Sequence, residues 1–251
     1  MNLSEIIRDL LNQPKKIDVK KLPTQGIFYK KDFELKIKKA DMEDIIEYEI
    51  NYEPENIYVI IDSLMKIVKN NVVLSKGYSF ADIKSVDMVY IFLEIVKFTL
   101  NKSIQIPFYN EKIAKPDYIE FDASNFNYFD FTTFKDRDLE TAEILIDGYR
   151  FSMPSIGVES SVTYFIASKK NQKKWTGLNY DFTFFVNNKT NLTFSEIENL
   201  VTIFNDDIDD KERNIIKKIK EQFTDLVGYS LKLDGSVIEI KSKLDLETIW
   251  K

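Results

Sequence analysis

"SVDMVYIFLEIVKFTL", residues 85–100, contains the most apolar part of the chain. Apolar residues occur nearly all round a helix of this sequence, so we expect a helix buried at the centre of the molecule and capped near Ser85. The run also contains Asp87, Glu94 and Lys97, and it is shorter than the roughly 20 residues that a membrane-spanning helix needs. It therefore predicts a core helix and no membrane anchor.

Further helices are predicted on both sides of this stretch. Residues 57–68 place apolar side chains on one face, which is typical of an amphipathic helix. An acidic first turn predicts a short helix from Asp41, and the helical period resumes at residues 158–166. Thr193-Phe194-Ser195-Glu196 is a capping box that predicts the start of another helix, and one more is expected after residue 210.

The sequence LPTQGIFY, residues 22–29, is predicted to form a turn that leads into a strand. Its proline and glycine favour a turn, and the alternating apolar residues at 33–37 predict a half-exposed strand. Neighbouring residues of an extended chain point to opposite faces. We therefore expect one of Phe28 and Tyr29 to lie in the core and the other to contact a partner.

Strand-like segments rich in β-branched and aromatic residues lie within residues 103–153. Two Asp-Gly pairs, at 147–148 and 234–235, separate alternating segments and predict two-residue hairpin turns. We expect an α+β fold, with a mostly helical body and short antiparallel β segments or hairpins after each helical half. The expected organisation is an N-terminal amphipathic arm and linker at 1–21, an N-terminal α+β domain at 22–155 and a C-terminal helical domain with a terminal β-hairpin at 156–251.

Two segments are candidates for binding a partner. A helix as short as the arm is marginal alone in water, so its apolar stripe docks either on the body of this chain or on another chain. The aromatic run at 126–134 is richer in aromatic residues than ordinary surface loops, and it either contacts a partner or packs on the core of this chain. The candidate residues are Leu3, Ile6, Ile7, Leu10 and Leu11 in the arm and Phe126, Tyr128, Phe129 and Phe131 in the run.

The composition excludes several classes of chemistry. The chain has 251 residues and a formal net charge of -6, which disfavours broad binding to nucleic acid. Because it contains no cysteine and no histidine, disulfides, thiolate nucleophiles, His-ligated metals and imidazole bases are excluded. The sequence predicts no cofactor, no metal and no small-molecule substrate.

The remaining charged patterns favour ordinary structural roles. Asn205–Asp210 lacks the glycine and the carboxylate that a calcium loop has at its sixth and twelfth positions, so a helix-capping loop is favoured. Lysines in KKNQKKW, residues 169–175, complement the end of the preceding helix. No glycine-rich phosphate loop or serine elbow occurs, and nothing singles out a catalytic pair among the 41 acidic residues. We therefore expect no enzymatic activity.

Several of these features together resemble the baseplate hub proteins of T-even-like contractile-tailed bacteriophages. The similarity lies in the polar leader, LPTQGIFY at 22–29, the alternating strand and the acidic helix start DMED at 41–44. It continues with PSIG at 154–157, which follows a strand and opens a helix, and with a β-rich tail that ends near Trp250. Many members of that family carry Cys-x-x-Cys pairs in the β segments, whereas this chain has hairpin turns and aromatic residues there.

The resemblance implies a non-enzymatic structural subunit of the baseplate, in the hub or inner wedge region. It implies contacts with other baseplate and tail proteins through the arm and the aromatic segments. Such a subunit is assembled in the host bacterial cytoplasm and resides in the tail baseplate of the virion. An assembly chaperone for the tail or hub, absent from the mature particle, is the alternative; a small hydrolase is a third class and needs two buried carboxylates in a cleft.

Overall fold

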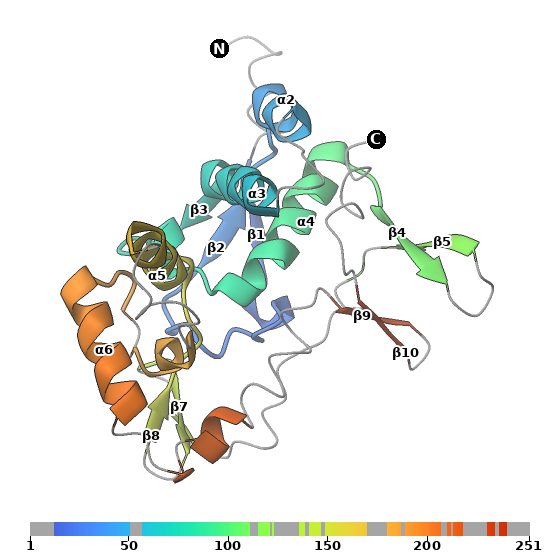
Figure 1. Ribbon diagram of the computed structural model, residues 1–251. Coiled ribbons are helices and arrows are strands. Elements are labelled where there is room, and N and C mark those ends of the chain that lie inside the picture. The colour runs from blue at the N-terminus through green and yellow to red at the C-terminus, as the bar shows by residue number, and fades with distance from the viewer. Residues whose placement is uncertain are drawn as a thin grey trace.

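The computed structural model of the chain describes residues 13–50, 57–110, 115–120, 122, 136–138, 141–146, 149–169, 180–186, 189–206, 210–211, 213–217, 230–233 and 236–239. These residues form helices and small antiparallel sheets, which confirms the predicted α+β class. Figure 1 shows a helical body from which two β-hairpins, β4–β5 and β9–β10, extend on one side.

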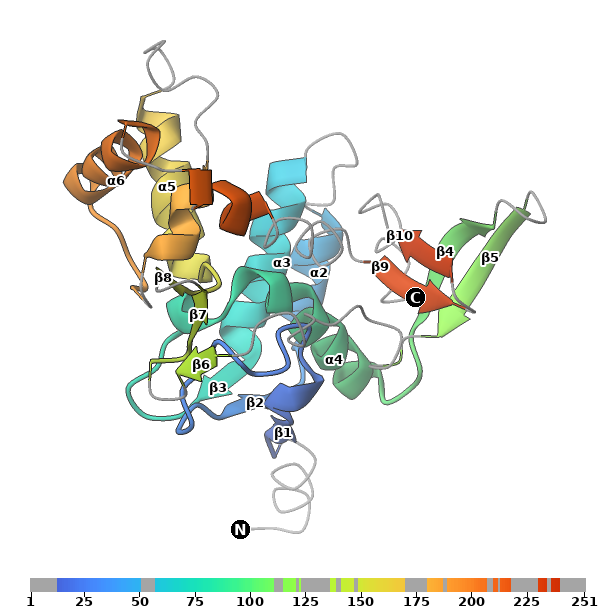
Figure 2. The same ribbon diagram turned by 90° about the horizontal axis from the view of Figure 1, so that it is seen from below.

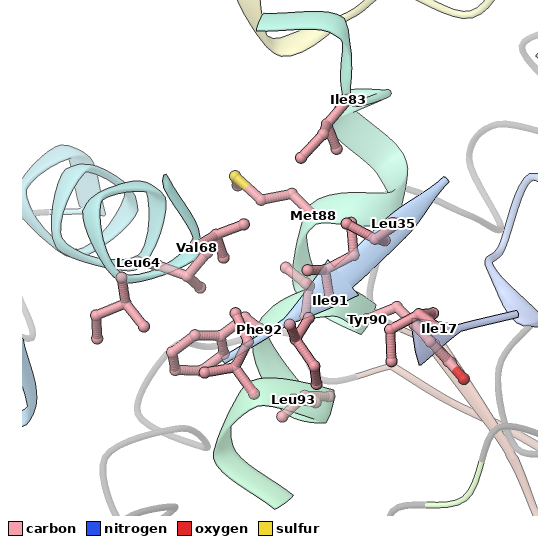
Figure 3. Packing of buried hydrophobic residues seen from close by; sticks show 14 of the residues in the cluster. Ile17, Leu35, Leu64, Val68, Ile83, Met88, Tyr90, Ile91, Phe92 and Leu93 are labelled. Atoms are coloured by element: carbon pink, nitrogen blue, oxygen red, sulfur yellow. The ribbon is translucent and has the colours of Figure 1, made fainter. Parts of the chain in front are cut away.

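Helix α4, Met88–Leu100, is the central element of the first half, as predicted. Its side chains through Val96 are all buried. Helix α3, Ile57–Asn71, packs along it. Figure 3 shows Leu64 and Val68 of α3 pointing toward α4, and both side chains are buried. The helical face that the sequence indicates at 57–68 is therefore a core face over its described part.

A three-stranded antiparallel sheet covers another side of α4. Its strands, in spatial order, are β1 (Lys15–Ile17), β2 (Leu35–Ile37) and β3 (Val72–Leu74). In β2, Leu35 and Ile37 are buried while Lys36 is exposed, which confirms the predicted half-exposed strand. Figure 3 shows Ile17 and Leu35 against α4, so the sheet and α3 enclose this helix from two sides.

Helix α2, Met42–Ile50, follows β2 and packs on α3. The backbone N–H of Asp44 donates to the carboxylate of Asp41 at 2.9 Å, so Asp41 stabilises the acidic first turn that the sequence predicts. The ring of Tyr48 contacts Phe92 of α4 with 5.7 Å between centroids. Figure 1 shows α2 beside α3 at one end of the molecule.

Helices α5 (Ile156–Ser168) and α6 (Phe194–Asp206) pack together in the second half. A 3-10 helix, Tyr180–Phe185, lies between them in sequence. The predicted capping box at the start of α6 is present. The N–H and hydroxyl of Thr193 each donate to the Glu196 carboxylate at 2.8 Å, and the Glu196 N–H donates to the Thr193 hydroxyl at 3.3 Å.

The remaining strands form antiparallel hairpins and one small sheet. The pairs are β4 (Gln105–Asn110) with β5 (Lys115–Glu120), β6 (Asp136–Asp138) with β7 (Glu143–Ile146), β7 with β8 (Tyr149–Phe151), and β9 (Ser230–Leu233) with β10 (Ser236–Glu239). Ile146 lies opposite Tyr149, and Leu233 lies opposite Ser236, so each Asp-Gly pair connects two strands as predicted. Figures 1 and 2 show β4–β5 and β9–β10 on the side of the body away from α6.

Buried apolar side chains form three clusters among the described residues. The first surrounds α4, and the third lies between α5 and α6. The second contains Ile27, Phe28, Phe151, Phe184 and Ile215. It takes residues from both sides of the boundary predicted between 155 and 156, and the division into two domains stays a prediction.

Candidate functional site

Residues 22–29 form consecutive tight turns, as the sequence predicts. The N–H of Gln25 donates to the carbonyl of Leu22 at 2.7 Å. Gly26 has φ +73°, and a Cβ at this position would lie 3.0 Å from a side-chain carbon of Val19 and 3.1 Å from its carbonyl oxygen. Glycine is therefore favoured at position 26 by both backbone conformation and space.

Phe28 and Tyr29 are both buried, with 4% and 6% of their surface exposed. Phe28 belongs to the second cluster, whereas Tyr29 belongs to the first and stacks on Phe33 with 4.2 Å between ring centroids. The prediction that one of them faces a partner was wrong. The turn lies between two cores rather than on an outer face, so both rings are covered by this chain.

A buried polar junction, formed by Thr24, Tyr29, Lys84 and Asp87, connects the turn to the start of α4. One oxygen of the Asp87 carboxylate accepts from the Thr24 N–H at 2.9 Å. The other accepts from the Thr24 hydroxyl at 2.7 Å and from the Tyr29 hydroxyl at 2.8 Å. The Tyr29 oxygen in turn accepts from the Lys84 N–H at 2.9 Å. These bonds compensate for burying polar groups of the turn.

Lys84 extends the junction toward the strand that precedes α5. Its ammonium nitrogen donates to the Ser152 hydroxyl at 3.3 Å, and its backbone pairs with Ser155 in an isolated antiparallel bridge. The side chain is buried, and Ser152 directly follows β8. The junction therefore binds the N-terminal turn, the start of α4 and the start of α5 together.

Burial controls the ionisation of the junction. It raises the pKa of Asp87 from 3.8 to about 6, although the hydrogen bonds from Thr24 and Tyr29 act in the opposite direction. It lowers the pKa of Lys84 from 10.5 to about 8, against the effect of the nearby Asp87 charge. The pKa of Tyr29 is well above 10.0, because of burial first and the Asp87 charge second. At neutral pH the junction contains a carboxylate and an ammonium of opposite charge.

The junction can hold segments together, but it is closed to a substrate. Thr24 and Asp87 have no exposed surface, and Lys84 and Tyr29 are nearly as buried. The three bonds to Asp87 all come from the turn of this chain. A catalytic acid or base must lie within hydrogen-bonding reach of a substrate, so the arrangement supports a structural role.

The start of α5 is fixed to the segment before α4. The N–H of Ile156 donates to the Ile83 carbonyl at 2.8 Å, and the N–H of Ser85 donates to the Pro154 carbonyl at 3.2 Å. The Ser155 hydroxyl accepts from the N–H of residue 158 at 3.3 Å, which caps the helix. Sequence analysis predicted that a helix opens here, and the structure adds the contact with residues 83–85.

Gly157 allows α5 to approach its neighbours closely. A Cβ at this position would lie 1.9 Å from the Thr190 carbonyl oxygen and 2.7 Å from the Cβ of Ala81. Since real Cβ atoms do not approach backbone this closely, any larger residue forces the helix away from the loop at residue 190. The last residue of the PSIG motif is thus explained by packing.

One exposed apolar surface lies on α2, which buries a polar side chain and exposes apolar ones. The Asp44 carboxylate accepts from the side-chain amides of Asn70 and Asn71 of α3 at 2.9 and 2.8 Å and is buried. Met42 and Ile46 are 67% and 46% exposed. These two residues, one helical turn apart, form what we call the α2 outer face.

A second exposed surface joins α5 and α6. Tyr164 is 70% exposed and its ring lies 5.7 Å from that of Phe194. The ring of Phe194 also meets the buried ring of Phe165 edge-on, with 5.2 Å between centroids. We call Tyr164 and Phe194 the aromatic patch. One side of the patch packs on Phe165 of the third cluster, and the other side is exposed.

The other predicted partner-binding residues lie outside the described part of the chain. They are Leu3, Ile6, Ile7, Leu10, Leu11, Phe126, Tyr128, Phe129 and Phe131. The buried hydrogen bonds of Thr24 and Lys84 and the exposure of Met42 were not predicted from the sequence. A signal for the junction was present, because an aspartate in the most apolar run of the chain needs buried donors.

Among the described residues, no group of three or more acidic side chains is placed to hold a metal ion. Within the same ranges, no helix is both long and apolar enough to cross a membrane. No known family model, no curated protein and no solved structure matches this chain.

Proposed function

We propose that the protein is a structural subunit of a contractile phage tail baseplate, in the hub or inner wedge region, that acts through protein–protein contacts. The observation that carries this proposal is that two of the motifs on which the resemblance rests meet in space. LPTQGIFY at 22–29 and PSIG at 154–157 are far apart in sequence, and both bind residues 83–87.

This meeting supports the resemblance because chance matches have no reason to share a structural unit. Tyr29 of the first motif binds the Lys84 N–H. Ser155 and Ile156 of the second bind the backbone of Lys84 and Ile83. Both motifs thus contribute to one joint of the fold, which links the N-terminal turn, residues 83–87 and the start of α5.

The aromatic patch is the surface proposed to contact neighbouring subunits. Tyr164 and Phe194 are anchored on two packed helices, so binding costs little ordering of backbone. Aromatic side chains with one covered and one open side are typical of residues that dominate binding energy at interfaces.

Quantitative mass spectrometry of purified particles tests this proposal. The measurement is the copy number of this protein per particle in the phage that encodes it, relative to a tail subunit of known number. A fixed integral copy number, retained after stringent purification, is expected. Absence from particles and from tail intermediates in the infected lysate would overturn the proposal.

An assembly chaperone for the tail or hub is the second candidate, and the location of the aromatic patch on two helices is the observation that favours it. A helical surface that binds its partner reversibly suits a protein that dissociates after assembly. The same measurement separates the two roles. A chaperone is bound to tail proteins in the lysate and is missing from mature particles, whereas a subunit is present in both.

A further inference from the structure

Helix α2 buries Tyr48 and packs Ile45 against the first cluster, but it also exposes two apolar side chains. A surface helix normally buries its apolar stripe and exposes its charged side. In α2, the carboxylate of Asp44 is covered by two asparagines of α3, while Met42 and Ile46 face outward. This orientation leaves an apolar face, one helical turn long, without a partner among the described residues.

The N-terminal segment enters the fold at the same end of the sheet from which α2 starts. Strands β1 and β2 are antiparallel, and Lys15 at the start of β1 lies opposite Ile37 at the end of β2. The chain then reaches Met42 after four more residues, and hydrogen bonds from Lys38 to the Asn71 carbonyl and from Ala40 to Thr99 hold this link against α3 and α4. The sequence before Lys15 therefore begins beside the end of β2, from which the chain leads to α2.

A short linker connects the N-terminal segment to Lys15. Residues 12–14 separate Leu11 from Lys15, and four steps of extended chain span up to about 14 Å. The apolar residues before this linker recur at helical spacing, and a helix this short needs an apolar partner to persist in water. The segment thus needs an apolar surface to persist as a helix, and the α2 outer face is an exposed apolar surface.

We infer that residues 1–12 form an amphipathic helix that docks on the α2 outer face of the same chain. Its apolar stripe covers Met42 and Ile46, and its polar side, which includes Glu5, faces water. The occupant is the chain's own segment rather than a second copy, because the linker attaches it to the chain that carries the face and so raises its effective concentration. This inference is independent of the proposed function, since it concerns only contacts within one chain.

Disulfide trapping tests the inference directly. The chain has no cysteine, so the double variant Ile7→Cys with Ile46→Cys contains only the two thiols of interest. Glu5→Cys with Ile46→Cys is the matched control, because position 5 lies on the opposite side of a helix from position 7. Both full-length proteins are oxidised at micromolar concentration with diamide, and the products are followed by intact mass and non-reducing gel electrophoresis.

The expected result is a cross-link within the monomer that forms at least about tenfold faster for the pair with Ile7→Cys than for the control pair. Equal rates for the two pairs would overturn the inference, because an undocked segment brings both of its faces to position 46 alike. Disulfide-linked dimers in place of the cross-linked monomer would also overturn it, in favour of a second copy as occupant.

Limited proteolysis provides a second readout without cysteine chemistry. Trypsin cleaves after Arg8, which lies within the docked segment. In Met42→Ser with Ile46→Ser, cleavage at Arg8 is expected to be several-fold faster than in the wild type. Ile203→Ser, which replaces an equally exposed isoleucine on α6, is the control and leaves the rate unchanged. The same rate at Arg8 in all three proteins would contradict the inference.

Discussion

Helices α4 and α2 differ in how completely they bury their apolar residues. In α4, side chains from Met88 to Val96 are buried, and the carboxylate of Asp87 at its start is covered as well. In α2, a carboxylate faces the body while Met42 and Ile46 face outward. Both helices make buried polar bonds and both bury apolar residues, which in α2 include Tyr48, but only α2 leaves large apolar side chains exposed. The outward apolar residues of α2 form the face on which we propose that residues 1–12 dock.

The largest effect is expected for a truncation within α4. Phe92 is fully buried and contacts Tyr48 of α2. Phe92→Ala is expected to lower the free energy of unfolding by about 3–5 kcal/mol, because it removes apolar burial and leaves a cavity. Chemical denaturation measures this change. A loss as small as that of an exposed residue would mean that α4 is not the centre of the core.

The polar start of α4 is tested by Asp87→Asn. The amide cannot accept all three hydrogen bonds that the carboxylate accepts from Thr24 and Tyr29. We expect a loss of about 1–3 kcal/mol at pH 7 in urea unfolding, the cost of leaving a buried donor unsatisfied. Equal stability of variant and wild type would show that the junction does not hold the turn.

The same residue predicts a pH dependence. The pKa of Asp87 is raised from 3.8 to about 6 in the folded state, so between about pH 4 and pH 6 the folded chain binds more protons than the unfolded chain. The Asp87 contribution to the unfolding free energy therefore falls as pH rises through this window and is constant above it. The stability of the wild type relative to Asp87→Asn should decrease from pH 4 to pH 6. Parallel pH curves would contradict the assignment.

On α2, replacing a polar residue is expected to cost more stability than replacing an apolar one, which is the reverse of the usual order. Asp44→Ala removes the acceptor for Asn70 and Asn71 and is expected to cost about 1–2 kcal/mol. Ile46→Ala on the exposed side is expected to cost under about 1 kcal/mol. Thermal unfolding of both variants in parallel measures the order. A greater loss for Ile46→Ala would place the outer face in the core.

Much of the fold could be predicted because its signals are local. Apolar periodicity indicated α3 and α4, the Asp-Gly pairs indicated two hairpins, and Thr193 with Glu196 indicated the start of α6. The burial of both Phe28 and Tyr29 could not be predicted, since the second cluster brings residue 184 next to the turn. The orientation of α2 was equally hidden, because the amides that bind Asp44 come from α3.

The candidate site was less predictable than the fold for a physical reason. Tyr164 lies on the helical face of α5 that the sequence marks only as polar, and Phe194 falls inside a capping box. Their proximity depends on how α5 packs on α6, and this packing depends on Gly157 and its contact with Thr190. Spacing within one segment contains no information on such a contact.

The central claim is that the aromatic patch of Tyr164 and Phe194 serves assembly and not stability. The most direct measurement is a competition in which wild type and Tyr164→Ser are made together during infection, and their ratio in purified particles is compared with that in the lysate by mass spectrometry. The account predicts that the variant is depleted at least about tenfold in particles, while its unfolding free energy stays within about 0.5 kcal/mol of the wild type. Equal ratios in particles and lysate would contradict it.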